Sequence, residues 1–164
     1  MNETVRDKAR AAAALLVSHV RSYLRDYPTL NRLVAGVESS DRMIARAIDL
    51  VISDWNMTPP LIGNIDIRAV AQSGGPLSAF VLGTVAELLT QVAILQDRND
   101  LPYTDGQFSV RSSAKSAPYQ RIAGGLREKY ETQKRQYKVA KNIEGGWGTS
   151  ISSDYAVISV IEFY

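Results

Sequence analysis

The stretch GGPLSAFVLGTVAELLTQVAILQ, residues 74–96, decides the fold of this chain. Its glycine pair and proline form a strong breaker just before a helix start, because proline fits the first turn of a helix but not its interior. From Leu77 to about Asp97, apolar side chains recur at helical spacing with few charges among them. We therefore predict a central helix here. Its apolar face comprises Phe80, Val81, Thr84, Val85, Leu88, Leu89, Val92 and Leu95.

Two helices are expected before this central helix. The first covers about residues 3–27, where apolar side chains again recur at three- and four-residue steps, and Pro28 ends it. The second follows Ser39 or Ser40, because a serine hydroxyl can accept a hydrogen bond from a free amide of the first helical turn. The proline pair at 59–60 stops this second helix, since proline lacks an amide proton.

Two irregular segments separate the helices. Residues 61–75 are expected to form a loop with one short turn. Residues 99–116 are expected to form a long surface excursion that contains one short extended run, 107–111.

Two side chains at the end of the second helix are expected to differ in burial. Trp55 is expected in the core rather than at a ligand, and Asp54 is expected to face solvent.

A fourth, basic helix is expected over about residues 118–142. Residues 111–141 carry 9 Lys/Arg against two glutamates, whereas residues 1–110 carry 10 Lys/Arg and 12 Asp/Glu. Two interpretations follow: a solvated helix face, or a face that lines a channel or meets nucleic acid when several copies assemble. The candidate channel-facing side chains are Arg127, Lys129, Lys134, Arg135, Lys138 and Lys141.

A glycine pair, residues 124–125, lies inside this fourth helix. Each glycine costs about 1 kcal/mol relative to alanine in a helix interior. We therefore expect a neighbouring helix to approach closely there, or the helix to kink.

The end of the chain differs from the rest. Residues 145–148 (GGWG) predict a flexible hinge, and residues 155–164 are β-branched and aromatic, which favours a strand. Such a strand either returns to a small sheet with the run 107–111 or adds to another chain. The second alternative makes this arm a partner-binding segment. Its candidate contact residues are Trp147, Tyr155, Val157, Ile158, Val160, Ile161, Phe163 and Tyr164.

Together these elements predict a mainly α protein. Residues 1–144 form a small bundle of about four helices with a long loop, and residues 145–164 form an extended carboxyl-terminal β-arm. No stretch approaches the roughly 20 apolar residues that span a bilayer, so we expect a soluble protein made in the cytoplasm.

Little in the sequence indicates catalysis. The chain has no cysteine and one histidine, His19, which excludes thiolate chemistry and a histidine metal cluster. Ser112 and Lys115 match a Ser-x-x-Lys spacing without its accompanying motifs. Asp97, Asn99 and Asp105 suggest a calcium loop, but Pro102 stands where that loop needs glycine and the closing glutamate is absent. No phosphate-binding glycine motif occurs. We expect a protein that is not an enzyme and holds no cofactor or metal.

Taken in order, the elements resemble the head–tail adaptor, or connector, proteins of tailed bacteriophages. The likeness rests on DRMIARAIDLVISDWN (residues 41–56), the central stretch quoted above, the excursion from Asn99, the basic helix and the extended arm. It covers about residues 39–164 and lies in arrangement more than in motif. The helix before Pro28 and the closing YAVISVIEFY have no matched counterpart.

The resemblance implies a virion structural protein. Members of that family form a ring, commonly of twelve copies, beneath the portal, continue the DNA channel and send extended arms onto neighbouring proteins. It implies that the arm, residues 145–164, contacts the portal or an adjacent neck protein and that some basic side chains face passing DNA. Another phage tail or baseplate subunit is the first alternative. A cytosolic helical nucleic-acid-binding or regulatory protein is the second, from a different class.

Overall fold

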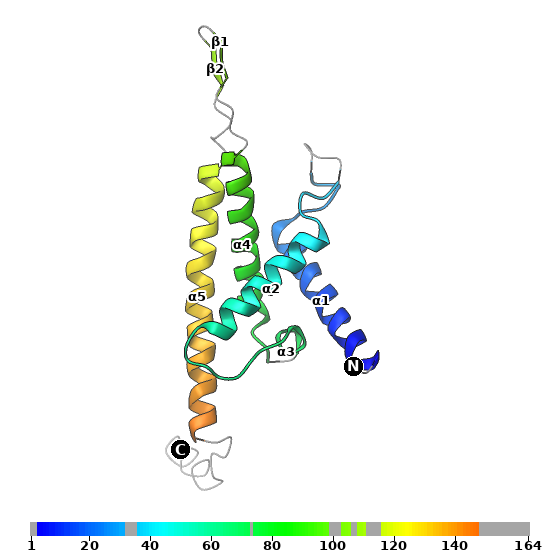
Figure 1. The fold of residues 1–164 in the computed structure, drawn as a ribbon, viewed down its shortest axis with the longest axis vertical. Coiled ribbons are helices and arrows are strands. Elements are labelled where there is room, and N and C mark those ends of the chain that lie inside the picture. Colours follow the sequence, from blue (N-terminus) through cyan, green and yellow to red (C-terminus); the bar gives the residue numbers. More distant parts are fainter. Residues whose placement is uncertain are drawn as a thin grey trace, which may run out of the picture.

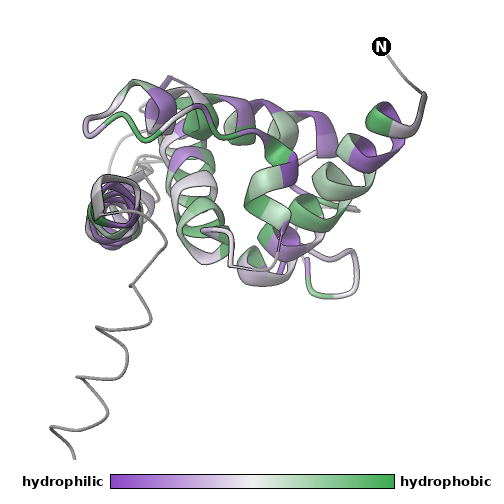
Figure 2. Cartoon of the chain, turned by 90° about the horizontal axis from the view of Figure 1, so that it is seen from below, coloured by the Kyte–Doolittle hydropathy of each residue, from purple (hydrophilic) through white to green (hydrophobic). Residues whose placement is uncertain are grey.

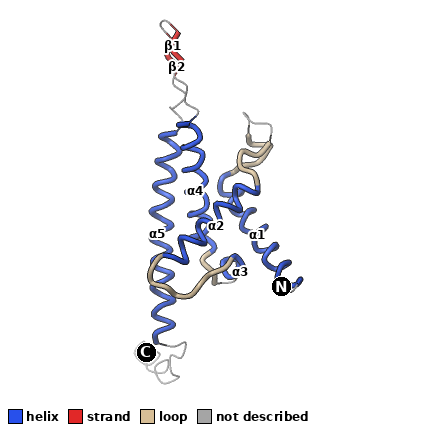
Figure 3. The backbone as a smooth tube through the Cα atoms, viewed as in Figure 1, coloured by secondary structure: helices blue, strands red, loops and turns tan. Residues whose placement is uncertain are grey.

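The computed structural model describes residues 3–31, 36–72, 74–98, 103–105, 108–110 and 116–147. Helices make up most of this part, which confirms the prediction of a mainly helical protein (Figure 3). In chain order the elements are α1 (Glu3–Leu24), α2 (Asp41–Met57), α3 (Ile67–Ala71), α4 (Leu77–Arg98), β1 (Tyr103–Asp105), β2 (Phe108–Val110) and α5 (Ser116–Trp147).

The helices α4 and α5 form a long antiparallel pair (Figure 1). The strands β1 and β2 lie at the turn between them, and α1, α2 and α3 gather on one side of the pair. The helix α4 contacts all four other helices, which confirms its central position. By length and composition it is also the one helix among the described residues that matches a membrane span, but half of that stretch is buried within the bundle. That burial is what the core helix of a bundle requires.

The core is built around a cluster of aromatic rings. The rings of Trp55 and Phe80 lie 4.9 Å apart between centroids, and Tyr137 meets Trp55 edge-on at 5.7 Å. Trp55, Phe80 and Tyr130 are fully buried, which confirms the expected core position of the tryptophan. Most of the predicted apolar face of α4 is buried or half-buried, except Leu95, which is exposed. Figure 2 shows hydrophobic residues where the helices face one another and many hydrophilic residues along α5.

The first helix ends at Leu24, earlier than Pro28 would require, and an aspartate network is the reason. Arg25 adopts a left-handed backbone conformation with φ 55°, which turns the chain. Asp26 then accepts hydrogen bonds from the backbone N–H groups of Glu38 and Ser39, both at 2.8 Å. Asn31 Nδ2 donates to the same carboxylate at 2.7 Å. The buried carboxylate therefore fixes the end of α1 against the start of α2.

The second helix begins as predicted. Ser40 is its N-cap, and its hydroxyl accepts from the backbone N–H of Met43. The helix continues to Met57, where Thr58 forms the C-cap and its hydroxyl donates to Asp54 O at 2.7 Å.

The helix α5 is longer than predicted, with 32 residues. It runs through residues 145–147, so the structure contradicts the prediction that a flexible hinge begins at residue 145. Gly124 and Gly125 are exposed, and a Cβ added at either would meet no atom within 4 Å. The expected close helix approach at this pair is therefore wrong. The close approach lies at Gly83 of α4 instead, where a Cβ would meet Tyr130 and Val51.

Residues 108–110 of the extended run predicted at 107–111 form β2, and residues 107 and 111 lie outside the described residues. The strand β2 pairs antiparallel with β1, with Thr104 opposite Ser109. Residues 148–164, which contain the predicted strand at 155–164, lie outside the described residues.

Candidate partner-binding site

Two of the six candidate channel-facing cations are buried in the protein's own core, where the end of α2 meets α5. Lys134 is 2 % exposed, and its Nζ lies 2.9 Å from Asp54 Oδ2 and 2.8 Å from Glu131 Oε2. Tyr130 Oη donates to the same Asp54 oxygen at 2.7 Å. Asp54, predicted to face solvent, has a side chain that is 41% exposed, and it is also the acceptor that joins α2 to α5 across this contact.

The titration of this cluster follows from its contacts. Burial tends to raise the pKa of Asp54, but hydrogen bonds from Lys134 and Tyr130 and the charge on Lys134 outweigh it, so the pKa is lowered. Burial, and then the hydrogen bond to Asp54, raise the pKa of Tyr130 well above its ordinary value. Both groups therefore stay in their usual charge states near neutral pH.

Lys138 is the second buried cation, at 1 % exposure. Its Nζ donates to Trp55 O at 2.5 Å and to Thr58 O, which are carbonyls at the end of α2. The same nitrogen lies 5.7 Å from the centre of the Trp55 ring. Burial and the nearby charge of Lys134 lower its pKa. Lys134 and Lys138 are buried and bind groups at the end of α2, so the structure does not place them at the surface with the other four predicted cations.

The other four cations lie at the surface of α5. Arg127 is half-buried and pairs with Glu87 of α4 at 3.2 Å. Lys141 pairs with Glu144 at 2.7 Å. Lys129 and Arg135 are exposed and make no ion pair with any described residue. Trp147, a predicted arm residue, is the last residue of α5, and the remaining predicted arm contacts lie outside the described residues.

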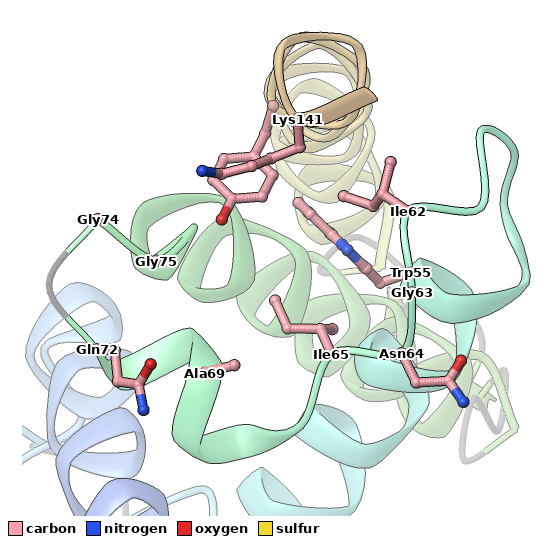
Figure 4. Close-up of a pocket in the computed structure, with 11 residues that line it drawn as sticks. Trp55, Ile62, Gly63, Asn64, Ile65, Ala69, Gln72, Gly74, Gly75 and Lys141 are labelled. Carbon is pink, nitrogen blue, oxygen red and sulfur yellow. The ribbon is translucent and has the colours of Figure 1, made fainter. Parts of the chain in front are cut away.

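A pocket of about 350 Å³ lies on the other side of Trp55 (Figure 4). Its walls come from distant parts of the sequence: the loop 62–65, the turn at Gly74–Gly75, and Tyr137 and Lys141 of α5. In Figure 4, Ile62 and Ile65 flank the Trp55 side chain, and the Lys141 amine stands across the opening. Sequence reasoning missed this pocket, because its walls are separated by dozens of residues along the chain.

Two local contacts shape the pocket walls. Asn56 holds the loop in place, since its Oδ1 accepts from the backbone N–H of Ile65 at 2.8 Å and its Nδ2 donates to Ile65 O at 3.1 Å. The second contact is at Gly75, where a side chain would clash with the carbonyl oxygens of Ala69 and Val70. Gly75 therefore allows the tight turn from α3 into α4.

The Trp55 indole has an unusual environment. It is 0 % exposed, yet its Nε1 has no hydrogen-bond acceptor among the described residues. Buried donors are normally paired, because an unpaired one loses its bond to water without replacement. Trp55 is also one of the residues that line the pocket, but its Nε1 atom is itself buried.

The remaining sequence candidates for chemistry lie only partly in the described part of the chain. No group of three His, Cys, Asp or Glu side chains lies close enough there to hold a metal ion. His19 is exposed on α1 beside a shallow groove that Tyr23 and Leu77 also line. Ser112 and Lys115 lie outside the described residues.

Comparison with known proteins gives no relative. No family model matches the chain, and neither the curated proteins nor the solved structures contain a match.

Proposed function

We propose that this chain is a structural subunit of a tailed-phage virion: a head–tail connector that forms a ring beneath the portal and continues the DNA channel. Twelve is the number of copies that the sequence resemblance implies. The protein acts by assembling and has no turnover. It is made in the host cytoplasm and ends in the virion.

The observation that carries the proposal is the exposed length of α5. The helix has 32 residues and its antiparallel partner α4 has 22, so α5 is longer by ten residues, or about 15 Å. The rest of the domain packs on one side of the pair (Figure 1). The side of α5 that the rest of the domain does not cover can contact a neighbouring copy in a ring. The other helices then take no part in that contact.

Exposed apolar side chains on this hairpin support subunit contacts. Ile94, Leu95 and Ile122 lie near the end of the pair closest to the β-strands, and each is about half exposed. Val139 and Ile143 are exposed on the opposite part of α5. Burying such surface between copies contributes about 25 cal/mol per Å², which favours assembly.

The surface cations support a role near DNA. Arg127, Lys129, Arg135 and Lys141 remain accessible after the two buried lysines are excluded. In one copy their charge is modest. In a ring the same four residues recur in every copy, so their fields add along the channel wall and attract the phosphate backbone without reading sequence.

The arm completes the proposal. Residues 148–164 supply an apolar segment for the portal or an adjacent neck protein, through strand addition in which main-chain hydrogen bonds give affinity. Tyr155, Val157, Ile161 and Phe163 would set its register by alternation.

The test is the oligomeric state of the full chain. Native mass spectrometry and electron microscopy of the purified protein across a concentration series should give closed rings. Replacement of Ile122 and Ile143 by serine should shift assembly to higher protein concentration, whereas Thr132→Ser on the same exposed surface should leave assembly unchanged.

Three outcomes would contradict the connector proposal. A chain that stays monomeric at high concentration, and gives no ring in purified particles, excludes the connector. Tight, salt-sensitive DNA binding by the monomer would favour the regulatory alternative, and a ring elsewhere in the tail would favour a tail or baseplate subunit.

A further inference from the structure

The solvent-facing side of α5 carries a seam of seven exposed residues, spaced alternately three and four positions apart. This spacing is that of the two contact positions of a heptad, by which one helix packs along another. Any exposed side of a helix contains positions at this spacing, so it is the residues at them that decide whether a second helix fits. The members of this α5 seam, over about 30 Å of helix, are Ile122, Gly125, Lys129, Thr132, Gln136, Val139 and Ile143.

Two properties of the α5 seam suit a second helix. It is apolar towards both ends, where Ile122, Val139 and Ile143 are 53%, 43% and 55% exposed. It also contains Gly125, a residue that disfavours a helix interior relative to alanine. A Cβ atom on Gly125 would meet nothing within 4 Å, so no close packing within one copy requires glycine there. A helix from outside the copy that passes close to this position would require it.

We propose that α5 pairs with α5 of a second copy of the chain, antiparallel, about a two-fold axis beside residues 130–131. In this register Ile122 lies opposite the partner's Val139, and Lys129 lies opposite the partner's Thr132. Gly125 lies opposite the partner's Gln136, where the missing side chain leaves room for the longer one. Because such a contact is isologous, each of these pairings occurs twice.

Charge selects this register. Glu128 and Arg135 flank the α5 seam on one side, and both are exposed without an ion pair to any described residue. In the antiparallel arrangement Glu128 meets the partner's Arg135, and the reverse pair forms by symmetry.

The alternative registers bring like charges together. A slide of one heptad sets Glu128 against the partner's Glu128 in one direction and Arg135 against the partner's Arg135 in the other. A parallel pair sets Lys129 against the partner's Lys129. Like charges in contact oppose association, so each alternative is disfavoured relative to the proposed pair.

This inference goes beyond the proposed function and does not rest on it. Copies in a ring that all point the same way make heterologous contacts, whereas the α5 pair has two-fold symmetry. The pair covers Ile122 and Ile143, which the proposed ring also uses, so it belongs to the free chain and must separate before a ring forms. Only three of the seven seam residues are apolar, which limits the burial that holds the pair together.

Charge reversal tests the register. Sedimentation equilibrium of the full chain at low salt measures the dissociation constant of the dimer. Glu128→Arg should raise this constant by about ten-fold, because two attractive pairs in each dimer become repulsive. Glu128→Arg combined with Arg135→Glu restores opposite charges and should return the constant to within about three-fold of the wild type. Asp49→Arg, the same change of net charge at an exposed position of α2, should leave the constant unchanged.

Engineered cysteines test the orientation, since the chain has none of its own. Gly125→Cys and Gln136→Cys are prepared as separate variants, mixed in equal amounts and oxidised. Mass spectrometry of the products should show disulfide dimers that contain one copy of each variant. Either variant alone should remain largely without disulfides, because its two cysteines lie about 16 Å apart along the antiparallel pair.

Several results would overturn the inference. Disulfides that form equally well between two copies of one variant would exclude the antiparallel register. A wild-type chain that shows no dimer at any concentration below ring formation would exclude the pair itself, as would equal effects of Glu128→Arg and Asp49→Arg. Rings from a chain that forms no dimer remove this inference alone, whereas antiparallel dimers of a chain that never forms rings remove the proposed function alone.

Discussion

Gly83 of α4 lies directly against the ring of Tyr130 of α5: a Cβ atom on Gly83 would be 2.9 Å from Tyr130 Cδ2. The same atom would lie 3.1 Å from Cγ1 of Val51 on α2. Three helices therefore meet at a position where no side chain fits. Tyr130 also reaches Asp54 from this contact, so the spacing of the helices at Gly83 sets the geometry of the buried cluster.

The first prediction concerns this contact. Gly83→Ala should lower the free energy of unfolding by about 1–3 kcal/mol, because a methyl group there forces Tyr130 or Val51 to move in a packed core. Gly124→Ala is the matched control. It should raise stability by about 0.5–1 kcal/mol, since a Cβ there meets nothing and alanine favours the helix. Urea denaturation measures the free energy of unfolding of both variants. A Gly83→Ala variant that is more stable than the wild type would contradict the prediction, because it would show that the core accommodates the methyl group.

The second prediction tests the structural role of Lys134. Lys134→Met keeps most of the side-chain volume but leaves Asp54 and Glu131 without their shared cation, so unfolding should become easier by about 1–2 kcal/mol. Lys129→Met, at an exposed position of the same helix, should change stability by less than about 0.5 kcal/mol. Thermal and urea unfolding at one pH and salt concentration provide the comparison. Equal effects of the two substitutions on the free energy of unfolding would show that Lys134 contributes no more to stability than an exposed lysine does.

The third prediction concerns acid. Burial tends to raise the pKa of Asp26, but hydrogen bonds from Ser39, Asn31 and Glu38 and the charge of Arg21 outweigh it, so the pKa lies below the ordinary 3.8. The folded state then binds this proton less readily than the unfolded state. The stabilisation is present above the unfolded pKa of 3.8 and is lost as pH falls through the folded pKa.

Asp26→Asn should therefore destabilise the protein by about 2–3 kcal/mol at pH 7, where the carboxylate accepts its charge-assisted bonds. The variant should also lose less stability between pH 4 and pH 2 than the wild type does. Asp49→Asn is the control at an exposed carboxylate of α2. Urea titrations across that pH range measure the slopes, and parallel slopes for Asp26→Asn and the wild type would refute the account.

The positions of the long helices were predictable because their signals are local. The apolar face from Phe80 to Leu88, the serine cap at Ser40 and the breaker before Leu77 each act within a few residues. The ends of α1 and α5 were predicted less well. Asp26 ends α1 through bonds to residues 12 and 13 positions away, and α5 continues through glycines that weigh against a helix locally.

The candidate site was predicted only in part. The richness of α5 in lysine and arginine was visible from composition, but which of these side chains are buried was not. Lys134 and Lys138 resemble their neighbours in sequence, and only the end of α2 distinguishes them by offering Asp54 and two free carbonyls.

The sequence by itself determined the helical class, the order of the long helices and the apolar faces that form the core, because helix periodicity and capping depend on neighbours within one or two turns. Only the tertiary structure decided which basic side chains of α5 are buried and where the pocket at Trp55 forms. Lys134 and Asp54 are separated by 80 positions, and the pocket walls come from α2, α5 and the segment between α2 and α4. Pairings over such separations depend on how whole helices pack, and no local pattern records that.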